Sequence, residues 1–563
     1  MYVIIIPIAT IKKSLRKPVL PMENQNRKNN FVRQAGVLAI AGIISRIIGI
    51  LYKSPLIALI GVEGVAYYNY AGNIYLIMLL ISSYSIPSAV SKEIAKKLVI
   101  HEYKNAQRIF YCSILYVLIV GGIFSAFTYF GAGLFVEKNS VLVLRLLAPA
   151  IFLSGFLGVY RGYFQGHNDM VHSSLSQILE QIFNAVFSLL AAGFFIRSVS
   201  QADTTKRAVY GAMGSALGTA AGVLFGLIFM LLIYWSGRKP RRKLLLKSSE
   251  IQPEPYAKII RNIFFYITPF IISTCIYNMT ATFNQTLYTK ILIYGKGIST
   301  DTVSAGYGIY SGEAIIFTTI PIAIASSISS AMLPDIAGAF SLGNIKETKR
   351  RVDMAIRFAM LICIPAAVGL FVLSKPIIYA MFPLKSTLKE ASDLLRCLSI
   401  TSILYGLSTI SNGVLQGIGK LKITTKNALL SLFIQTAVLA VLLSYTGLNL
   451  YALVIAAIIH SFLMCVLNAG SMTNCLKFEM DLKKSFVIPL TAAIFMGILA
   501  GFLYDFLHST CHSNILSLIL TIAVSAVVYF IAVIWLGGIS ESEISALPQG
   551  KILAAIAKWL KLF

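Results

Sequence analysis

The 563-residue chain holds 57% apolar and only 12% charged residues, and its mean hydropathy of +0.78 excludes a set of soluble domains. A net charge of +26 is compatible with a nucleic-acid-binding protein, but the basic residues lie between long apolar segments and form no separate domain. We therefore expect no nucleic-acid partner. Seven scattered cysteines without a CxxC pair exclude a disulfide framework, and we expect no metal and no cofactor.

Apolar segments of about 20 residues recur along the chain, which is the length that crosses a hydrocarbon core of ~30 Å as a helix. We predict an all-α polytopic membrane protein with about 14 transmembrane helices. The predicted spans cover residues 34–56, 67–90, 107–131, 142–164, 172–196, 207–235, 262–289, 307–333, 352–374, 391–417, 424–446, 449–473, 485–506 and 514–537.

The distribution of positive charge predicts the orientation of these spans. With the amino terminus inside, the inner segments and their flanks carry 34 of the 48 Lys and Arg residues, and the outer segments carry eight. Cytoplasmic loops carry an excess of Lys and Arg, so both termini are predicted to lie in the cytoplasm. We expect a multi-pass membrane protein.

A short motif occurs once in each half of the chain. Arg161-Gly-Tyr-Phe-Gln165-Gly166 ends the fourth predicted span, and Asn412-Gly-Val-Leu-Gln416-Gly417 ends the tenth, displaced by 251 residues. Two six-helix repeats of equal orientation predict two lobes with a site between them. The expected divisions are a cytoplasmic tail (1–33, with Met22 as an alternative start), an N-lobe (34–236), a basic linker (237–261), a C-lobe (262–474), two further helices (485–537) and an amphipathic cytoplasmic tail (538–563).

No catalytic signature is present. The run Gly417-Ile-Gly-Lys420 has neither the upstream spacing nor the Ser or Thr of a phosphate-binding loop, and there is no HExxH or GxSxG motif. We predict that the protein is not an enzyme. Any transport must then use an ion gradient, the membrane potential or the substrate gradient.

Charged residues inside spans are costly in lipid, so they mark candidate functional positions. Arg46 and Lys53 lie seven residues apart on one face of the first span and form a cationic stripe. Arg46 is our candidate ligand for a diphosphate, because a guanidinium binds two oxygens at once. The alternative is that Arg46 pairs with Glu180 or Glu313 and that Lys53 extends toward the membrane surface.

The seventh span carries a polar stripe at helical spacing, formed by Asn278, Thr282, Gln285 and Thr289. These side chains either contact sugar hydroxyls of a substrate or bind neighbouring helices. Glu180 and Glu313 are the candidates for coupling to H+ or Na+. Glycines at four-residue spacing on the sixth span predict a helix-packing face: Gly214, Gly218, Gly222 and Gly226.

Three sequence features resemble the polysaccharide and peptidoglycan-precursor flippases of the MOP superfamily, in particular its stage V sporulation protein B (SpoVB-type) and MurJ-like members. They are Ser45-Arg46-x-x-Gly49, the Ile86-Pro87-Ser88 end of the second span and Arg161-Gly-Tyr-Phe-Gln165-Gly166-His167. The resemblance implies a MATE-like fold and alternating-access transfer of an undecaprenyl-diphosphate-linked precursor, such as lipid II, between leaflets. It also implies a lipid-linked oligosaccharide as partner and a substrate-binding role for Arg46.

The sequence departs from this family at two places. MurJ-like proteins usually have further cationic residues in the second and eighth spans, whereas here the second span has none before Lys92 and the eighth has Glu313. A teichoic or capsular precursor is therefore an alternative to lipid II. A MATE-type cation-coupled drug exporter is a second alternative, which the cationic stripe disfavours, and a membrane-embedded transferase is a third.

Overall fold

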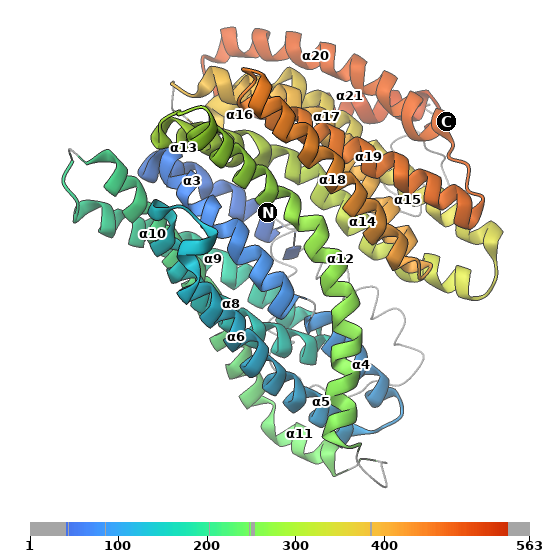
Figure 1. Cartoon of the computed structure of the whole chain (residues 1–563). Helices are drawn as coiled ribbons and strands as arrows, with labels where there is room; N and C mark the ends of the chain where they lie inside the picture. Colours follow the sequence, from blue (N-terminus) through green and yellow to red (C-terminus); the bar gives the residue numbers. More distant parts are fainter. Residues whose placement is uncertain are drawn as a thin grey trace. The chain divides into compact units, whose positions relative to one another are not determined.

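The computed structural model describes residues 41–538, except 43, 85, 202, 247, 249–253 and 383–385. Every regular element within these residues is a helix (Figure 1). Both predicted tails, 1–33 and most of 538–563, lie outside the described residues. The predicted all-α fold class is confirmed.

Twelve helical segments of the described chain are long and apolar enough to cross a membrane, so the chain is a multi-pass membrane protein. Two of the fourteen predicted spans are not counted separately among the twelve. Residues 34–40 of the first span are not described, and the seventh span forms a 35-residue helix, α12 (Tyr256–Lys290). The count of fourteen stays a prediction.

The chain divides into two compact units, Met1–Thr282 and Phe283–Phe563, which we call unit 1 and unit 2. The division falls inside α12, whereas the sequence predicts a linker over 237–261. Within unit 1 the helices are α3 (Lys53–Leu79), α4 (Ile86–Val99), α5 (Tyr103–Tyr116), α6 (Gly122–Phe130), α7 (Ala132–Phe135), α8 (Lys138–Gly166), α9 (Met170–Arg197), α10 (Thr204–Ser236) and α11 (Arg238–Leu245), with π-helical turns η1 (Leu80–Tyr84) and η2 (Val117–Gly121).

Unit 2 contains a comparable set of long helices. They are α13 (Thr300–Gly308), α14 (Ile315–Ser341), α15 (Ile345–Val372), α16 (Ser374–Met381), α17 (Leu388–Gly417), α18 (Leu421–Tyr445), α19 (Leu450–Leu476), α20 (Ile488–Cys511) and α21 (Asn514–Trp535), with π-helical turns η3 (Ile291–Gly295), η4 (Ile309–Ala314) and η5 (Lys483–Val487). In each unit a buried apolar cluster joins the helices, around Phe110 and Tyr234 in unit 1 and around Met360 and Tyr529 in unit 2.

The first two predicted spans are separated by one residue rather than by a loop. The described part of the first span is helical with a turn at Tyr52, and the helix continues to Ile60. Gly61 then breaks it with φ 72° and ψ 169°, a conformation open to glycine but strained for other residues. The second helix therefore starts before the predicted residue 67.

The glycine stripe on α10 packs against α9, as the sequence predicts (Figure 1). A Cβ atom on Gly214 would lie 2.2 Å from the backbone nitrogen of Ala192, and one on Gly218 would lie 2.3 Å from that of Ser188. The two backbones are too close for any side chain at these positions.

The segment before α12 is attached to the turn between α4 and α5. The Nζ atom of Lys97 donates to Glu254 Oε1 at 2.8 Å and to Glu102 Oε2 at 2.9 Å. The backbone nitrogen of Glu254 donates to Asn105 Oδ1 at 2.9 Å, and Arg108 Nη1 donates to the carbonyl oxygen of Glu254 at 2.8 Å. We call these five residues the α4–α5 clamp. It fixes the start of α12 to unit 1.

Candidate functional site

Arg46 lies on the helix that precedes the turn at Tyr52, and its side chain is exposed. The neighbouring side chains Ile44, Ile47 and Leu51 are exposed as well, at 40%, 49% and 57%. Because its guanidinium is exposed, Arg46 can bind an anion without disrupting the packing of neighbouring side chains. Lys53, the first residue of α3, is partly buried.

Glu180 has a different partner from the one suggested by the sequence. Its Oε2 atom accepts a hydrogen bond from Arg161 Nη2 at 2.7 Å, and Arg161 Nε donates to Ser176 Oγ at 2.8 Å. The side chains of Arg161 and Glu180 keep 14% and 23% of their surface exposed. The ion pair joins α8 to α9, and the sequence analysis did not anticipate it.

Glu313 lies in η4 and is fully buried. Its Oε1 atom accepts a hydrogen bond from Thr387 Oγ1 at 3.3 Å, and its Oε2 atom has no hydrogen-bond partner among the described residues. A buried carboxylate is stable only when a proton, a cation or several donors compensate its charge. The site is therefore suited to exchange of a small cation.

The polar stripe predicted for the seventh span lies on one uninterrupted helix, α12. Asn278 and Thr282 are partly buried, and Gln285 is buried. The Oγ1 atom of Thr289 donates to the carbonyl oxygen of Gln285 at 2.7 Å, so this hydroxyl bonds within the helix. The Oγ1 atom of Thr282 has no hydrogen-bond partner among the described residues. Thr282 keeps a free hydroxyl, and Thr289 does not.

The repeated motif forms equivalent turns in the two units. The amide of Asn168 donates to the carbonyl oxygen of Gln165 at 2.9 Å, and the amide of Gly419 donates to that of Gln416 at 3.0 Å. The glycine before each turn packs closely on another helix: a Cβ atom on Gly166 would lie 2.9 Å from Ile94, and one on Gly417 would lie 2.8 Å from Leu333. Gln165, Gly166, Gln416 and Gly417 therefore shape and pack the turns.

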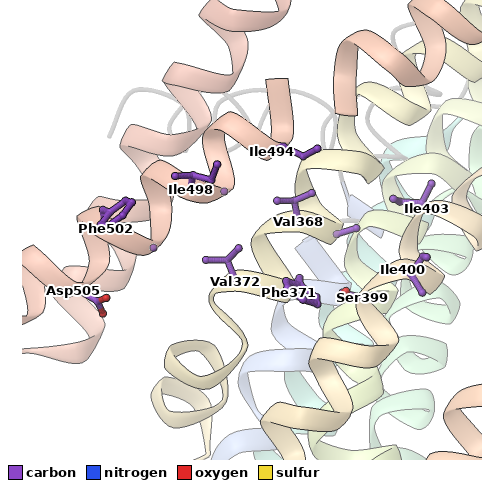
Figure 2. A pocket seen from close by; sticks show the side chains of 13 residues that line it. Val368, Phe371, Val372, Ser399, Ile400, Ile403, Ile494, Ile498, Phe502 and Asp505 are labelled. Carbon is purple, nitrogen blue, oxygen red and sulfur yellow. The ribbon is translucent and has the colours of Figure 1, made fainter. Parts of the chain in front are cut away.

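Unit 2 contains an apolar pocket of about 700 Å³ that the sequence analysis missed (Figure 2). Val368, Phe371 and Val372 of α15, Ser399, Ile400 and Ile403 of α17, and Ile494, Ile498 and Phe502 of α20 line it, together with Ala367, Gly497, Gly501 and Asp505. Asp505 is the sole carboxylate of the lining. Helix periodicity predicts that these positions are apolar but not that three helices leave space between them.

Among the described residues, no group of three or more His, Cys, Asp or Glu side chains is placed to hold a metal ion. His508, which lies on α20 near Cys511 and His512, stacks on Tyr504 with ring centroids 5.5 Å apart.

Comparison with known proteins identifies a family. A profile described as a polysaccharide biosynthesis protein matches residues 31–340, a second profile with that description matches 387–514, and the MatE profile matches 301–446. The chain is 26% identical to a protein of Bacillus subtilis (strain 168) named "Lipid II flippase MurJ" over 513 residues, which cover 84% of this chain and 88% of that protein.

Two further similarities agree with this match. The chain is 22% identical to "Stage V sporulation protein B" of the same bacterium, over 92% of this chain and 98% of that protein. A crystal structure described as MATE in complex with MaL6 matches the fold with a TM-score of 0.58 and 17% identity, over 82% of this chain and 98% of that chain. The expected MATE-like fold and MOP-superfamily membership are confirmed.

Proposed function

Because the chain belongs to the polysaccharide biosynthesis protein family, we propose that it is a flippase for an undecaprenyl-diphosphate-linked cell-wall precursor. The substrate is lipid II or a related polysaccharide intermediate, which moves from the inner to the outer leaflet of the bacterial cytoplasmic membrane by alternating access. Similarity to the lipid II flippase over most of both chains is the observation that supports this substrate class. The protein transports its substrate and does not convert it.

The exposed cation of the first helix fits the head of such a substrate. A diphosphate carries negative charge into a region of low dielectric, where Arg46 offers two parallel N–H donors and Lys53 adds a second positive charge. Asn278, Thr282 and Gln285 of α12 provide amide and hydroxyl groups for the sugar hydroxyls. Each of these five residues is our candidate for a contact with the substrate.

The pocket of unit 2 fits the tail of the substrate. An isoprenoid chain has no polar group, and the pocket is lined by aliphatic and aromatic side chains apart from Ser399 and Asp505 (Figure 2). An isoprenoid chain inside a bilayer is already out of contact with water, so van der Waals packing against the lining holds it in the pocket, not removal of apolar surface from water.

Glu313 is the better of the two candidates for ion coupling. Glu180 already has a guanidinium partner at 2.7 Å, whereas the carboxylate of Glu313 is buried with a single weak donor. We propose that Glu313 binds H+ or Na+ during the transport cycle.

A MATE-type cation-coupled multidrug exporter is the second candidate function, and the MatE match over residues 301–446 favours it. A leaflet-resolved assay distinguishes the two. The purified protein is reconstituted in vesicles that contain labelled lipid II, and accessibility of the label is followed with time. We expect protein-dependent appearance of lipid II in the opposite leaflet; export of cationic drugs with no movement of lipid II would show that the second function is correct.

A further inference from the structure

Resting on the proposed function, we propose that Arg161 binds a phosphate of the substrate and that Glu180 is the carboxylate that occupies this guanidinium between substrates. The Arg161–Glu180 pair is thus a second anion site, separate from Arg46 and built on α8 and α9.

The geometry leaves the guanidinium capacity for a ligand. An arginine side chain has five N–H donors, and Arg161 uses Nε to donate to Ser176 and Nη2 to donate to Glu180. Both charged side chains are partly exposed although both belong to membrane-spanning helices. Tyr75 of α3 lies close enough to Glu180 to interact with it electrostatically. Three helices of unit 1 therefore surround a polar, accessible position.

The corresponding position in unit 2 is neutral. The displacement of 251 residues that relates the two motifs also relates Met170 to Leu421, which begin α9 and α18. The turn residues Asn168 and Gly419 both have positive φ, 58° and 77°. The same displacement places Asn412, Asn427 and Ser431 at the positions of Arg161, Ser176 and Glu180.

Neutral amides hold the helices of unit 2 together at this level. Asn468 Nδ2 of α19 donates to Asn412 Oδ1 at 2.9 Å, and Asn427 Nδ2 donates to Asn468 Oδ1 at 2.9 Å. Asn427 and Asn468 are buried, and Ser431 bonds to His460 instead. Joining the helices therefore does not require an ion pair, and an ion pair in a membrane span has a larger desolvation cost than an amide network. The charge of unit 1 fits binding of an anion.

Phosphate competes well for this guanidinium. It offers several oxygens with the spacing that a guanidinium binds bidentately, and a diphosphate carries more negative charge than one carboxylate. When a phosphate binds Arg161, Glu180 is released from the ion pair, and no covalent bond changes.

In the test, Arg161 and Glu180 of unit 1 are replaced by the neutral residues that stand at the corresponding positions of unit 2. The double variant Arg161→Asn/Glu180→Ser removes both charges, so that neither is left unpaired, and Glu180→Gln removes only the competing carboxylate. Binding of farnesyl diphosphate to the purified full-length proteins is measured by calorimetry, with the melting temperature recorded for each. We expect the double variant to melt like the wild type and to bind at least tenfold more weakly, and Glu180→Gln to bind more tightly than the wild type.

Wild-type affinity in the double variant would overturn the proposal, as would absence of farnesyl diphosphate binding to the wild type. Phosphatidylglycerol is added in a parallel series, because a membrane lipid is the other source of phosphate. Equal competition by phosphatidylglycerol would mean that the site takes lipid headgroups rather than the substrate. In the lipid II assay, failure of the wild type contradicts the proposed function, whereas equal transport by wild type and double variant contradicts only the role of Arg161.

Discussion

Mutation of Arg46 can separate the free-energy cost of placing its guanidinium in the membrane from its role in binding the substrate. Arginine at the centre of a membrane helix costs about 2.5–3.5 kcal/mol on insertion scales. We therefore expect Arg46→Ala to accumulate in the membrane at least as well as the wild type while lipid II transport is lost. Arg46→Lys keeps the charge without the planar fork, so partial transport is expected. Arg197→Ala, at the exposed end of α9, is the control.

If Arg46→Ala misfolds and neutralising Glu313 as well restores folding, the arginine has a structural partner. That result would contradict a role in substrate binding.

The buried carboxylate of Glu313 in η4 can be tested by a change that removes its charge. Glu313→Gln keeps the shape of the side chain but neither titrates nor binds a cation strongly, so we expect an intact fold and transport that no longer responds to a proton or sodium gradient. Transport into vesicles with and without each gradient measures this. Asp301→Asn, on the exposed first turn of α13, is the control and should keep the response. A gradient response retained by Glu313→Gln would exclude it as the coupling residue.

Sequence reasoning locates charged residues in spans but not their partners. Arg46, Glu180 and Glu313 were identified because charge is rare in apolar segments. The partner of Glu180 was missed, although Arg161 and Ser176 lie at similar distances from the turn between α8 and α9, where an antiparallel helix pair brings side chains together. Hydrogen-bond networks of neutral amides, such as that of Asn412 and Asn468, leave no comparable signal in the sequence.

Helices and their packing faces were largely predictable, because lipid forces every long apolar segment into a helix and close packing requires small residues. Irregularities within helices were not. Hydropathy indicated neither the π-helical turns of the described residues nor the break at Gly61. The early start of α12 depends on the α4–α5 clamp, whose ion pair between Lys97 and Glu254 joins residues 157 positions apart in the chain.

The contact between α9 and α10 depends on glycine at Gly218, where a Cβ atom would lie 2.1 Å from Ser188 Oγ. Gly218→Val should destabilise unit 1 by about 1–3 kcal/mol or more, because backbones that touch cannot separate without losing their packing. A lower melting temperature in detergent measures this effect. Gly470→Ala is the control, since a Cβ atom there meets nothing within 4 Å. Equal melting temperatures would contradict the close approach of α9 and α10.

The α4–α5 clamp predicts a local dependence on pH. The hydrogen bond from Lys97 holds the pKa of Glu254 below its ordinary value of 4.5, and it lowers the pKa of Glu102 in the same way. A carboxylate with a lowered pKa stabilises the folded state above its unfolded pKa, and this contribution is lost as the pH falls through the folded pKa. The protection of residues 254–258 against hydrogen exchange, relative to the intrinsic exchange rate at each pH, should stay constant from pH 7 to 5 and decrease below about pH 4.5.

In Glu254→Gln, residues 254–258 should already have at pH 7 the low protection that the wild type shows below about pH 4.5. Lys258→Gln should change it little, because Lys258 Nζ is 3.6 Å from Glu254 Oε1 and 59% exposed. Exchange that is insensitive to Glu254→Gln would mean that the ion pair does not fix the start of α12.

At the scale of the whole chain, the internal repeat was visible in the sequence because its turn chemistry needs particular residues. Gly166 and Gly417 must be small where α8 and α17 touch α4 and α14, and the same residue type at the same place in both halves made the repeat visible. The division into units at Thr282 and Phe283 was not readable, because it falls within a continuous helix. The apolar pocket of unit 2 was also invisible to the sequence, since lipid-facing and pocket-facing side chains have the same composition.

The orientation of the chain in the membrane is inferred from the distribution of charge alone, and fusion reporters test it. Lys and Arg are retained on the cytoplasmic side, and 34 of the 48 lie in segments that share one side if the amino terminus is inside. A fluorescent protein fused after Phe563 should therefore be fluorescent, and alkaline phosphatase fused there should be inactive. A phosphatase fusion after Gly447, in the short connection between α18 and α19 that carries no Lys or Arg, should be active. The opposite pattern at both sites would reverse the orientation, and phosphatase activity at both would show that the number of spans after Gly447 is even rather than odd.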